Sequence, residues 1–225
     1  IRAIKKEDDE GALFSRYDLS SLRSLFLAGE RCDVATYYWA SNLLKIPVID
    51  HWWQTESGWP MVSPVFGPLG IPQIKPGSAG RPMPGYQIEI LNESGEVLIP
   101  NQEGYIGIKL PLPPGCLPTL YNDDERFVSS YLDTFPGYYL TGDGGYLDEE
   151  NYLYIMGRID DVINVAGHRL STGEMEEMVS GHKTVAECAV IGMADELRGQ
   201  IPLAFVVLKD GNHITETVLE TELVQ

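Results

Sequence analysis

Basic residues are scarce in this chain of 225 residues. The sequence contains 16 Lys and Arg against 33 Asp and Glu, which gives a formal net charge of −17 at pH 7. Nucleic acids and anionic membrane surfaces are bound through dense Lys and Arg, so this balance argues against both as partners. A small anionic ligand is still compatible with it, because one or two local arginines and helix N-termini are enough to bind one.

Cysteines and long apolar runs are also scarce. Cys32, Cys116 and Cys188 are widely spaced without a CxxC pair, a pattern typical of reduced thiols in an intracellular protein. No apolar run approaches the roughly 20 residues of a membrane-spanning helix. The four histidines lack metal-ligand spacing, and there is no GxSxG, Walker or GxGxxG motif. The sequence signs of a zinc site, a serine hydrolase and a Walker-type nucleotide site are therefore all missing.

The N-terminal part of the chain alternates between strand and helix patterns. Residues 22–30 form a short apolar run ending at glycine, and residues 33–45 place apolar residues at helical spacing behind an Asp N-cap. Residues 46–56 begin with a second apolar strand. This order predicts a parallel α/β layer over about 1–85. Residues 60–85, rich in Pro and Gly, predict a long irregular connection at its end.

The rest of the chain reads as mixed β and α+β structure. Alternating residues at 86–110 and an acidic turn between two apolar runs at 145–157 predict antiparallel strands in a β-rich part over about 86–159. After Asp160 we expect a strand, then a helix opened by a Ser171–Glu174 capping box, then two buried strands at 185–193 and 201–209. The predicted fold class is therefore α/β (α+β), divided into residues 1–159 and 160–225.

Residues 50–58, DHWWQTESG, are the first candidate site. Two adjacent tryptophans at a strand end point to opposite faces, so at least one must leave the main core. An indole beside Gln, Thr and Glu supplies an apolar wall with polar anchors, which suits a small-ligand pocket. The Glu56 carboxylate suits Mg²⁺ shared with a substrate phosphate. The alternative is an aromatic packing corner with a solvated Glu.

Three further positions suggest ligand contacts. Gly29, in the AGE that ends a strand, could place backbone against a flat ligand, or it could simply form a turn. Asp143 lies between glycines and could accept both hydroxyls of a ribose, although an Asx turn is the alternative. Arg158 follows after the hairpin, and its fork suits phosphate or carboxylate, with an ordinary salt bridge to a neighbouring Asp as the alternative.

In their joint order these segments resemble a known family. They are AGE at 28–30, DHWWQTESG at 50–58, and the tracts 139–171 and 185–208. Together they resemble the acyl-adenylate-forming enzymes of the acetyl-CoA synthetase type, over nearly the whole chain. The stretches ERCD at 30–33, LPLPPG at 110–115 and INVAGHR at 163–169 are similar to the propionate-preferring branch of the short-chain acyl-CoA synthetases.

The resemblance implies a two-step acid–thiol ligase with propionate or acetate, ATP and CoA as substrates and Mg²⁺ as cofactor. A carboxylate would attack the α-phosphate to give acyl-AMP and pyrophosphate, a small domain would swing, and the CoA thiol would displace AMP. Part of an AMP-binding large domain would occupy residues 1–159, and a truncated mobile domain would occupy 160–225.

The resemblance also implies roles for individual residues. The nucleotide would be bound by Gly29, Glu30, Arg31, Asp50, His51, Trp52, Trp53, Gln54, Thr55, Asp143 and Arg158. Trp53 would also close the acyl pocket, Glu56 would hold Mg²⁺ and Asp160 would be the hinge. CoA would lie along Ala166, Gly167 and Arg169.

Two parts of the family pattern are missing from the sequence, namely the Ser/Thr/Gly-rich phosphate loop and the C-terminal lysine that drives adenylation. We therefore expect a fragment that is inactive alone, and no catalytic residue is assigned. The alternatives are a truncated, non-catalytic binding module and a medium-chain acyl-CoA ligase, against which Trp53 argues. The resemblance implies the mitochondrial matrix as compartment, or the cytoplasm if the protein is bacterial.

Overall fold

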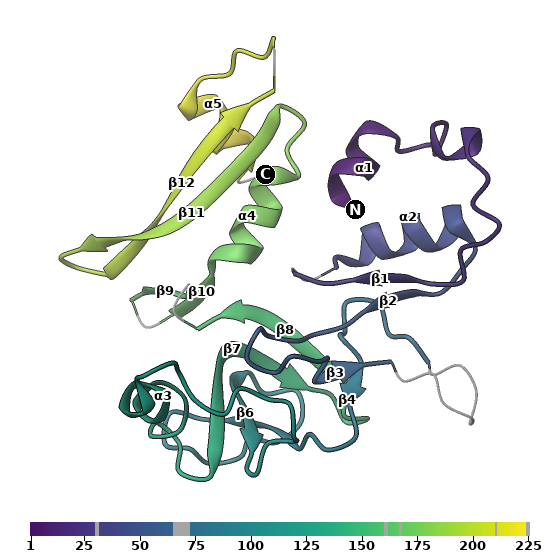
Figure 1. Cartoon of the computed structure of the whole chain (residues 1–225). Helices are drawn as coiled ribbons and strands as arrows, with labels where there is room; N and C mark the ends of the chain where they lie inside the picture. Colours follow the sequence, from purple (N-terminus) through teal and green to yellow (C-terminus); the bar gives the residue numbers. More distant parts are fainter. Residues whose placement is uncertain (30–31, 65–72, 160–161, 167, 210, 224–225) are drawn as a thin grey trace. The chain divides into compact units, whose positions relative to one another are not determined.

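A computed structural model describes residues 1–29, 32–64, 73–159, 162–166, 168–209 and 211–223 (Figure 1). The chain forms two compact units. Unit 1 contains Ile1–Thr141 and Gly145–Ile155, and unit 2 contains Gly142–Gly144 and Met156–Gln225. The predicted domain boundary at Asp160 lies a few residues beyond Met156, where the longer segment of unit 2 begins, and Asp160 itself lies outside the described residues. The assignment of domains therefore stays a prediction.

The N-terminal part of unit 1 has the predicted strand–helix–strand order. A short helix α1 (Arg2–Glu7) and a 3₁₀ turn η1 (Phe14–Arg16) precede β1 (Leu25–Leu27), α2 (Val34–Leu44) and β2 (Val48–Asp50). The strands β1 and β2 are parallel, and α2 is the crossover that such a pair needs (Figure 1). Asp33 caps α2 by accepting a hydrogen bond from the Thr36 amide at 2.7 Å, as its position predicted.

The connection after β2 is more regular than predicted. It contains an antiparallel pair, β3 (Val62–Ser63) and β4 (Arg81–Pro82). Gly80 makes the pair possible, because its φ is 105° and a Cβ there would lie 2.6 Å from the Pro64 nitrogen. The predicted long irregular connection over 60–85 thus contains two strands of two residues each, and residues 65–72 lie outside the described residues.

A four-stranded sheet lies mostly in unit 1, and its first two strands are antiparallel, as predicted. Its strands β5 (Ile88–Leu91), β6 (Gly104–Lys109), β7 (Tyr138–Leu147) and β8 (Leu153–Arg158) are neighbours in sequence order. Helix α3 (Asp124–Tyr131), between β6 and β7, was not predicted. Phe127 is its one buried residue, so the helical apolar spacing in the sequence is weak.

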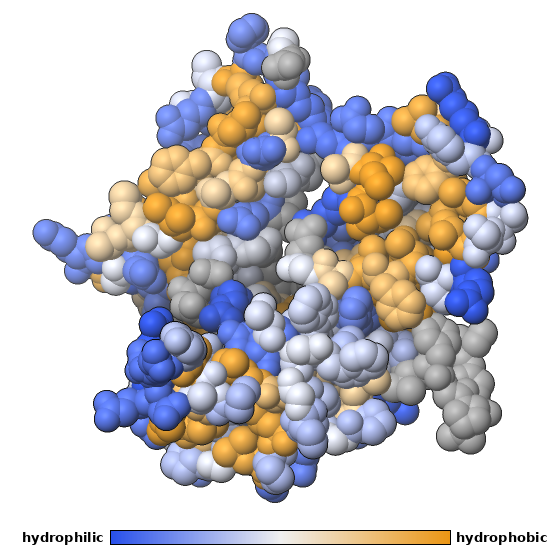
Figure 2. Space-filling model, viewed as in Figure 1, coloured by the Kyte–Doolittle hydropathy of each residue, from blue (hydrophilic) through white to orange (hydrophobic). Residues whose placement is uncertain are grey.

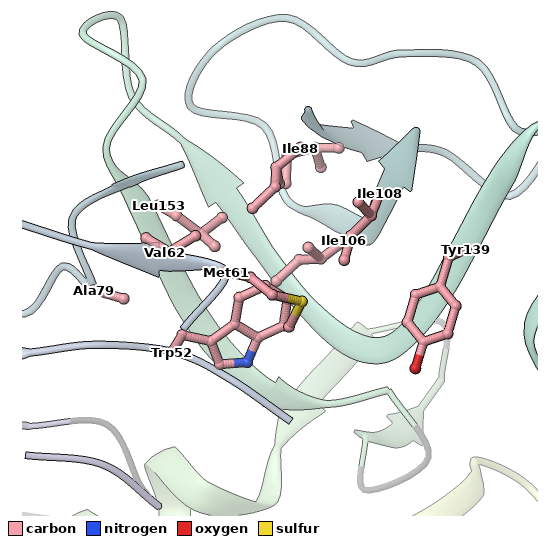
Figure 3. Close-up of a cluster of buried hydrophobic side chains, with 10 residues drawn as sticks. Trp52, Met61, Val62, Ala79, Ile88, Ile106, Ile108, Tyr139 and Leu153 are labelled. Carbon is pink, nitrogen blue, oxygen red and sulfur yellow. The ribbon is translucent and has the colours of Figure 1, made fainter. Parts of the chain in front are cut away.

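The core of unit 1 lies between this sheet and the residues around β3 (Figure 3). Its buried members are Trp52, Met61, Val62, Ala79, Ile88, Ile90, Ile106, Ile108, Tyr139 and Leu153. In Figure 3 the Trp52 indole lies beside Met61 and faces the sheet. Because Trp52 comes two residues after β2, this packing fixes where the candidate segment 50–58 leaves the strand.

Unit 2 contains a four-stranded sheet and two helices. Its elements are β9 (Val162–Val165), β10 (His168–Ser171), α4 (Thr172–Ser180), β11 (Val185–Asp195), β12 (Gly199–Leu208) and α5 (Glu216–Leu223). The strand order is β10-β9-β12-β11, and α4 packs on β11. Sequence reasoning missed β10 as a separate strand. In the part of the chain that is described, no helix is long and apolar enough to span a membrane.

The two strands predicted at 185–193 and 201–209 are present, but they are not buried strands. They form the long β11–β12 hairpin, and one face of it exposes side chains to between 36% and 57%. These side chains are Ile191, Met193, Leu203, Phe205 and Val207. Figure 2 shows apolar surface over this hairpin. The sequence suggested burial because both strands are apolar in nearly every position, yet α4 covers only one face.

Candidate functional site

Asp50 connects the first two predicted groups of site residues. It ends β2, it is 9% exposed, and its Oδ2 atom accepts a hydrogen bond from the Cys32 amide at 3.1 Å. Cys32 is therefore held against the end of β2, because the ends of parallel neighbours meet at one edge. Gly29 itself has a φ of 98°, and no heavy atom of the described residues lies within 4 Å of the place where a Cβ would be.

The two tryptophans lie in opposite environments. Trp52 is 9% exposed and belongs to the core, whereas Trp53 is 46% exposed. This confirms the prediction that one indole leaves the core. The Trp53 indole is thus more available to a ligand than the Trp52 indole. His51, beside them, packs edge-on against Phe26, with 5.7 Å between ring centroids.

A tight turn follows the tryptophans. The Ser57 hydroxyl accepts a hydrogen bond from the Gln54 amide at 3.0 Å and donates one to the Gln54 carbonyl at 2.8 Å. The Gln54 side-chain amide donates to the Thr141 carbonyl at 2.7 Å. Thr55, between them, is exposed. The turn therefore fixes the polar side chains of this segment while Thr55 stays accessible.

Glu56 is held by helix α3. The Tyr131 hydroxyl donates a hydrogen bond to Glu56 Oε1 at 3.1 Å, and the backbone carbonyl of Glu56 accepts one from the Leu117 amide at 2.7 Å. This half-buried carboxylate therefore has one protein partner, and its role as a metal ligand stays a prediction. The other carboxylate oxygen has no hydrogen-bond partner among the residues that the structure describes.

One ordered carboxylate is the kind of ligand that Mg²⁺ uses when substrate phosphates supply other oxygens. Among the described residues, no group of three or more His, Cys, Asp and Glu could hold a metal ion without such help. The residues present therefore fit Mg²⁺ that arrives with a nucleotide, and they do not form an all-protein cage.

The second group of predicted site residues, Asp143 and Arg158, lies in unit 2. Asp143 and Arg158 are 15 residues apart in sequence, but strands β7 and β8 bring them together, with Arg158 Nη1 3.6 Å from Asp143 Oδ1. The carboxylate side chain is 10% exposed and the guanidinium side chain is 48% exposed. The predicted return of Arg158 to Asp143 is present. The Asx-turn alternative is wrong, since Asp143 lies within β7, and the salt-bridge alternative describes the pair as it stands.

Gly142 allows this pair to form. Its φ is 75°, and a Cβ there would lie 2.7 Å from Arg158 Nη2. Its carbonyl accepts a hydrogen bond from the Ile159 amide at 2.9 Å, which fixes the chain just after Arg158. Arg158 thus lies directly on the Gly142 backbone with half of its side chain in solvent, a suitable position for binding an anionic group.

The remaining predicted residues are only partly described. Ala166 follows β9 with a φ of 51°, is exposed, and donates its amide to the Arg198 carbonyl at 2.8 Å. A positive φ is typical of hairpin turns, and Ala166 lies between the antiparallel strands β9 and β10. Arg169 pairs with Asn164 through the backbone. Glu30, Arg31, Asp160 and Gly167 lie outside the described residues.

Sequence reasoning missed the residues that hold the site. Tyr131 lies 75 positions from Glu56, and nothing in its local pattern marks it. Gly142 was visible as part of TGDGG, but only its contact with Arg158 shows why glycine is needed there. The partner of Asp50 depends on the packing of β1 against β2, which spacing alone could not give.

The sequence matches two family descriptions. Residues 2–112 match "AMP-binding enzyme", and residues 174–225 match "AMP-binding enzyme C-terminal domain". The chain therefore belongs to the AMP-binding enzymes, the acyl-adenylate-forming family that its motifs resemble. Residues 113–173, which contain Asp143 and Arg158, lie between the two matches.

Curated relatives place the chain within this family. An uncharacterized protein of Pseudomonas aeruginosa is 56% identical over 224 residues, covering 100% of this chain and 36% of that protein. The human mitochondrial acyl-CoA synthetase short-chain family member 3 is 50% identical, covering 98% of this chain and 32% of its own length. The propionate–CoA ligase of Escherichia coli is 47% identical, covering 96% and 34%. The chain thus spans about a third of the length of the curated relatives it matches.

A solved structure agrees with the fold. The anthranilate CoA ligase AuaEII, crystallised with anthranoyl-AMP, matches with a TM-score of 0.73 at 28% sequence identity. The match covers 93% of this chain and 39% of that protein. The mixed α/β architecture is therefore that of an adenylate-forming enzyme.

Proposed function

We propose that the protein carrying this chain is an AMP-forming acid–thiol ligase that converts propionate or acetate into its CoA thioester. The observation that carries the proposal is the similarity to propionate–CoA ligase, 47% identical over 218 residues. It includes the candidate site segments, since it covers 96% of this chain. Because the chain spans about a third of that relative, the activity belongs to the whole protein.

In the first step a carboxylate oxygen of the acid attacks the α-phosphorus of ATP, and the bond to pyrophosphate breaks. Asp143 would accept the ribose hydroxyls, and Arg158 would face the phosphate side of the same nucleotide. Gly29, Glu30 and Arg31 would lie against the adenine, with residues 50–55 along the rest of the nucleotide. Such a step depends mainly on positioning and on stabilising charge, which suits a guanidinium held at a fixed place.

In the second step the CoA sulfur attacks the acyl carbonyl carbon, and AMP leaves with the electron pair of the broken anhydride bond. Ala166, Gly167 and Arg169 would lie along CoA, and Asp160 would be the hinge for the change between the two steps. The exposure of Ala166 supports this role, because an exposed residue can contact a ligand.

Mg²⁺ would be held by Glu56 together with phosphate oxygens, where it would offset the negative charge of the triphosphate. The acyl group would end against Trp53, whose half-exposed indole would limit chain length. Each rejected methylene is worth about 1–3 kcal/mol, so such a pocket should exclude long acids but separate acetate from propionate poorly. This argues against a medium-chain ligase.

The isolated 225 residues should be inactive, because the family's phosphate loop and adenylating lysine do not occur among them. The proposed location of the protein is the mitochondrion, by similarity to the human relative, or the cytoplasm if the protein is bacterial. The net charge of −17 leaves anion binding to local groups such as Arg158 and backbone amides.

The test is a competition on the full-length protein. Acetate, propionate and butyrate are offered together with Mg·ATP and CoA, and the acyl-CoA products and AMP are quantified. Propionyl-CoA or acetyl-CoA should predominate, with one AMP formed for each thioester. Release of ADP in place of AMP, or no thioester with any of the three acids, would refute the proposal.

A further inference from the structure

Two stacked tyrosines hold the turn that contains Glu56. The rings of Tyr131 and Tyr139 lie 5.2 Å apart between centroids and are parallel to within 4°. The Tyr131 hydroxyl donates to Glu56 Oε1 at 3.1 Å, and the Tyr139 hydroxyl donates to Gln54 Oε1 at 3.5 Å. One aromatic stack thus contacts two side chains that are two residues apart in the same turn.

Both tyrosines are themselves fixed. Tyr139 is 3% exposed and belongs to the core of unit 1. Tyr131 ends α3, where it packs against Phe127 one helical turn earlier, with 5.5 Å between ring centroids. Phe127 is 8% exposed and anchors that helix. The Tyr131 hydroxyl therefore reaches Glu56 from a rigid support.

We propose that Tyr131 is a positioning residue for the metal ligand Glu56, fixing the carboxylate so that its free oxygen is ready for Mg²⁺. This rests on the proposed function, because it takes Glu56 as the carboxylate that binds Mg·ATP. A free Glu side chain would lose rotamer freedom on binding the ion, and the hydrogen bond from Tyr131 removes that freedom in advance. The Leu117 amide holds the backbone of the same residue.

The test measures ATP binding by calorimetry on the full-length protein, with no acid substrate present. ATP is titrated in a series of Mg²⁺ concentrations and in excess EDTA, for the wild type and for Tyr131→Phe. The variant keeps the ring stack but loses the hydroxyl. Partners of a metal ligand typically affect metal affinity by about 10–100-fold. We expect the gain in ATP affinity from Mg²⁺ to fall by about tenfold, with affinity in EDTA unchanged.

Two controls separate this role from a structural one. Tyr146 stacks on Tyr154 at 4.8 Å elsewhere in unit 1, so Tyr146→Phe removes a hydroxyl from a similar pair and should leave Mg²⁺ dependence unchanged. In a Glu56→Gln background, Tyr131→Phe should have no further effect on Mg²⁺ dependence. Melting temperatures are measured for every variant to detect unfolding.

The outcomes are distinct. An unchanged Mg²⁺ dependence in Tyr131→Phe, an equal loss of ATP affinity with and without Mg²⁺, or additive effects with Glu56→Gln would each overturn the role of Tyr131. So would ATP binding by the wild type that does not depend on Mg²⁺. If the predicted tenfold loss occurs in a protein that forms no acyl-CoA, the positioning role stands and the proposed ligase activity fails.

Discussion

The two groups of predicted site residues are held by opposite means. Residues 50–56 of unit 1 are fixed by large side chains, with Trp52 packed in the core and Tyr131 bonded to Glu56. The Asp143–Arg158 pair of unit 2 depends on the absence of a side chain, since Gly142 leaves room for the guanidinium. The first group should therefore respond to loss of packing volume, and the second to the addition of a single methyl group.

The largest expected effect separates the two tryptophans. Trp52→Ala removes a buried indole from the core and should lower the free energy of unfolding by about 3–5 kcal/mol. Trp53→Ala removes a half-exposed indole and should change it by less than about 1 kcal/mol. Urea unfolding followed by circular dichroism measures both. Equal destabilisation by the two variants would contradict their opposite placement.

Trp53 should instead affect selectivity. If its indole closes the acyl pocket, Trp53→Ala in the full-length protein should raise kcat/KM for butyrate relative to propionate. The expected gain is about 1–3 kcal/mol, or roughly 10-fold or more, because one methylene is newly accommodated. Competition between the two acids measures the ratio directly. A ratio that stays at the wild-type value would remove Trp53 from the acyl pocket.

Adding one methyl group at Gly142 tests the Asp143–Arg158 pair. Gly142→Ala places a side chain at a φ of 75° and within 2.7 Å of the Arg158 guanidinium. The strain should cost about 1–2 kcal/mol of stability, and the displaced Arg158 should weaken ATP binding. Gly137→Ala is the matched control, because Gly137 has a φ of 89° but no neighbour within 4 Å of its Cβ position. Similar loss of ATP affinity in both variants would show that strain alone is responsible.

The smallest expected effect is on how stability depends on pH, through the Cys32 thiol beside Asp50. Desolvation by burial, followed by the negative charge of Asp50, raises the pKa of the Cys32 thiol to about 12 from 9.0. The folded protein therefore keeps this proton while the unfolded chain loses it, so stability falls as pH rises from about 9 towards about 12. Urea unfolding of wild type and Cys32→Ala at pH 8 to 10 should show a shallower decline for the variant. Cys188→Ala, which removes a half-buried thiol, is the matched control.

Much of this arrangement could be predicted from local patterns. Asp33 marked the start of α2, alternation marked the antiparallel sheet, and the paired tryptophans required one exposed indole. These features depend on residues a few positions apart. The hydrogen bond from Tyr131 to Glu56 and the packing of α3 depend on residues some 75 positions apart, brought together only by the tertiary fold. Burial of the β11–β12 hairpin was mispredicted for a related reason, because apolar sequence does not specify which faces are covered.

The path of strand β7 prevents the two units from being separated by one cut in the chain. It begins in unit 1, contributes Gly142–Gly144 to unit 2 and returns to unit 1, so the chain passes between the units three times. No single proteolytic cut can release them as two intact pieces. A chain ended at Ile155 would keep Asp143 but lose Arg158, and one begun at Met156 would keep Arg158 without Asp143. The Asp143–Arg158 ion pair is thus a property of the continuous chain and cannot be reconstituted within either half alone.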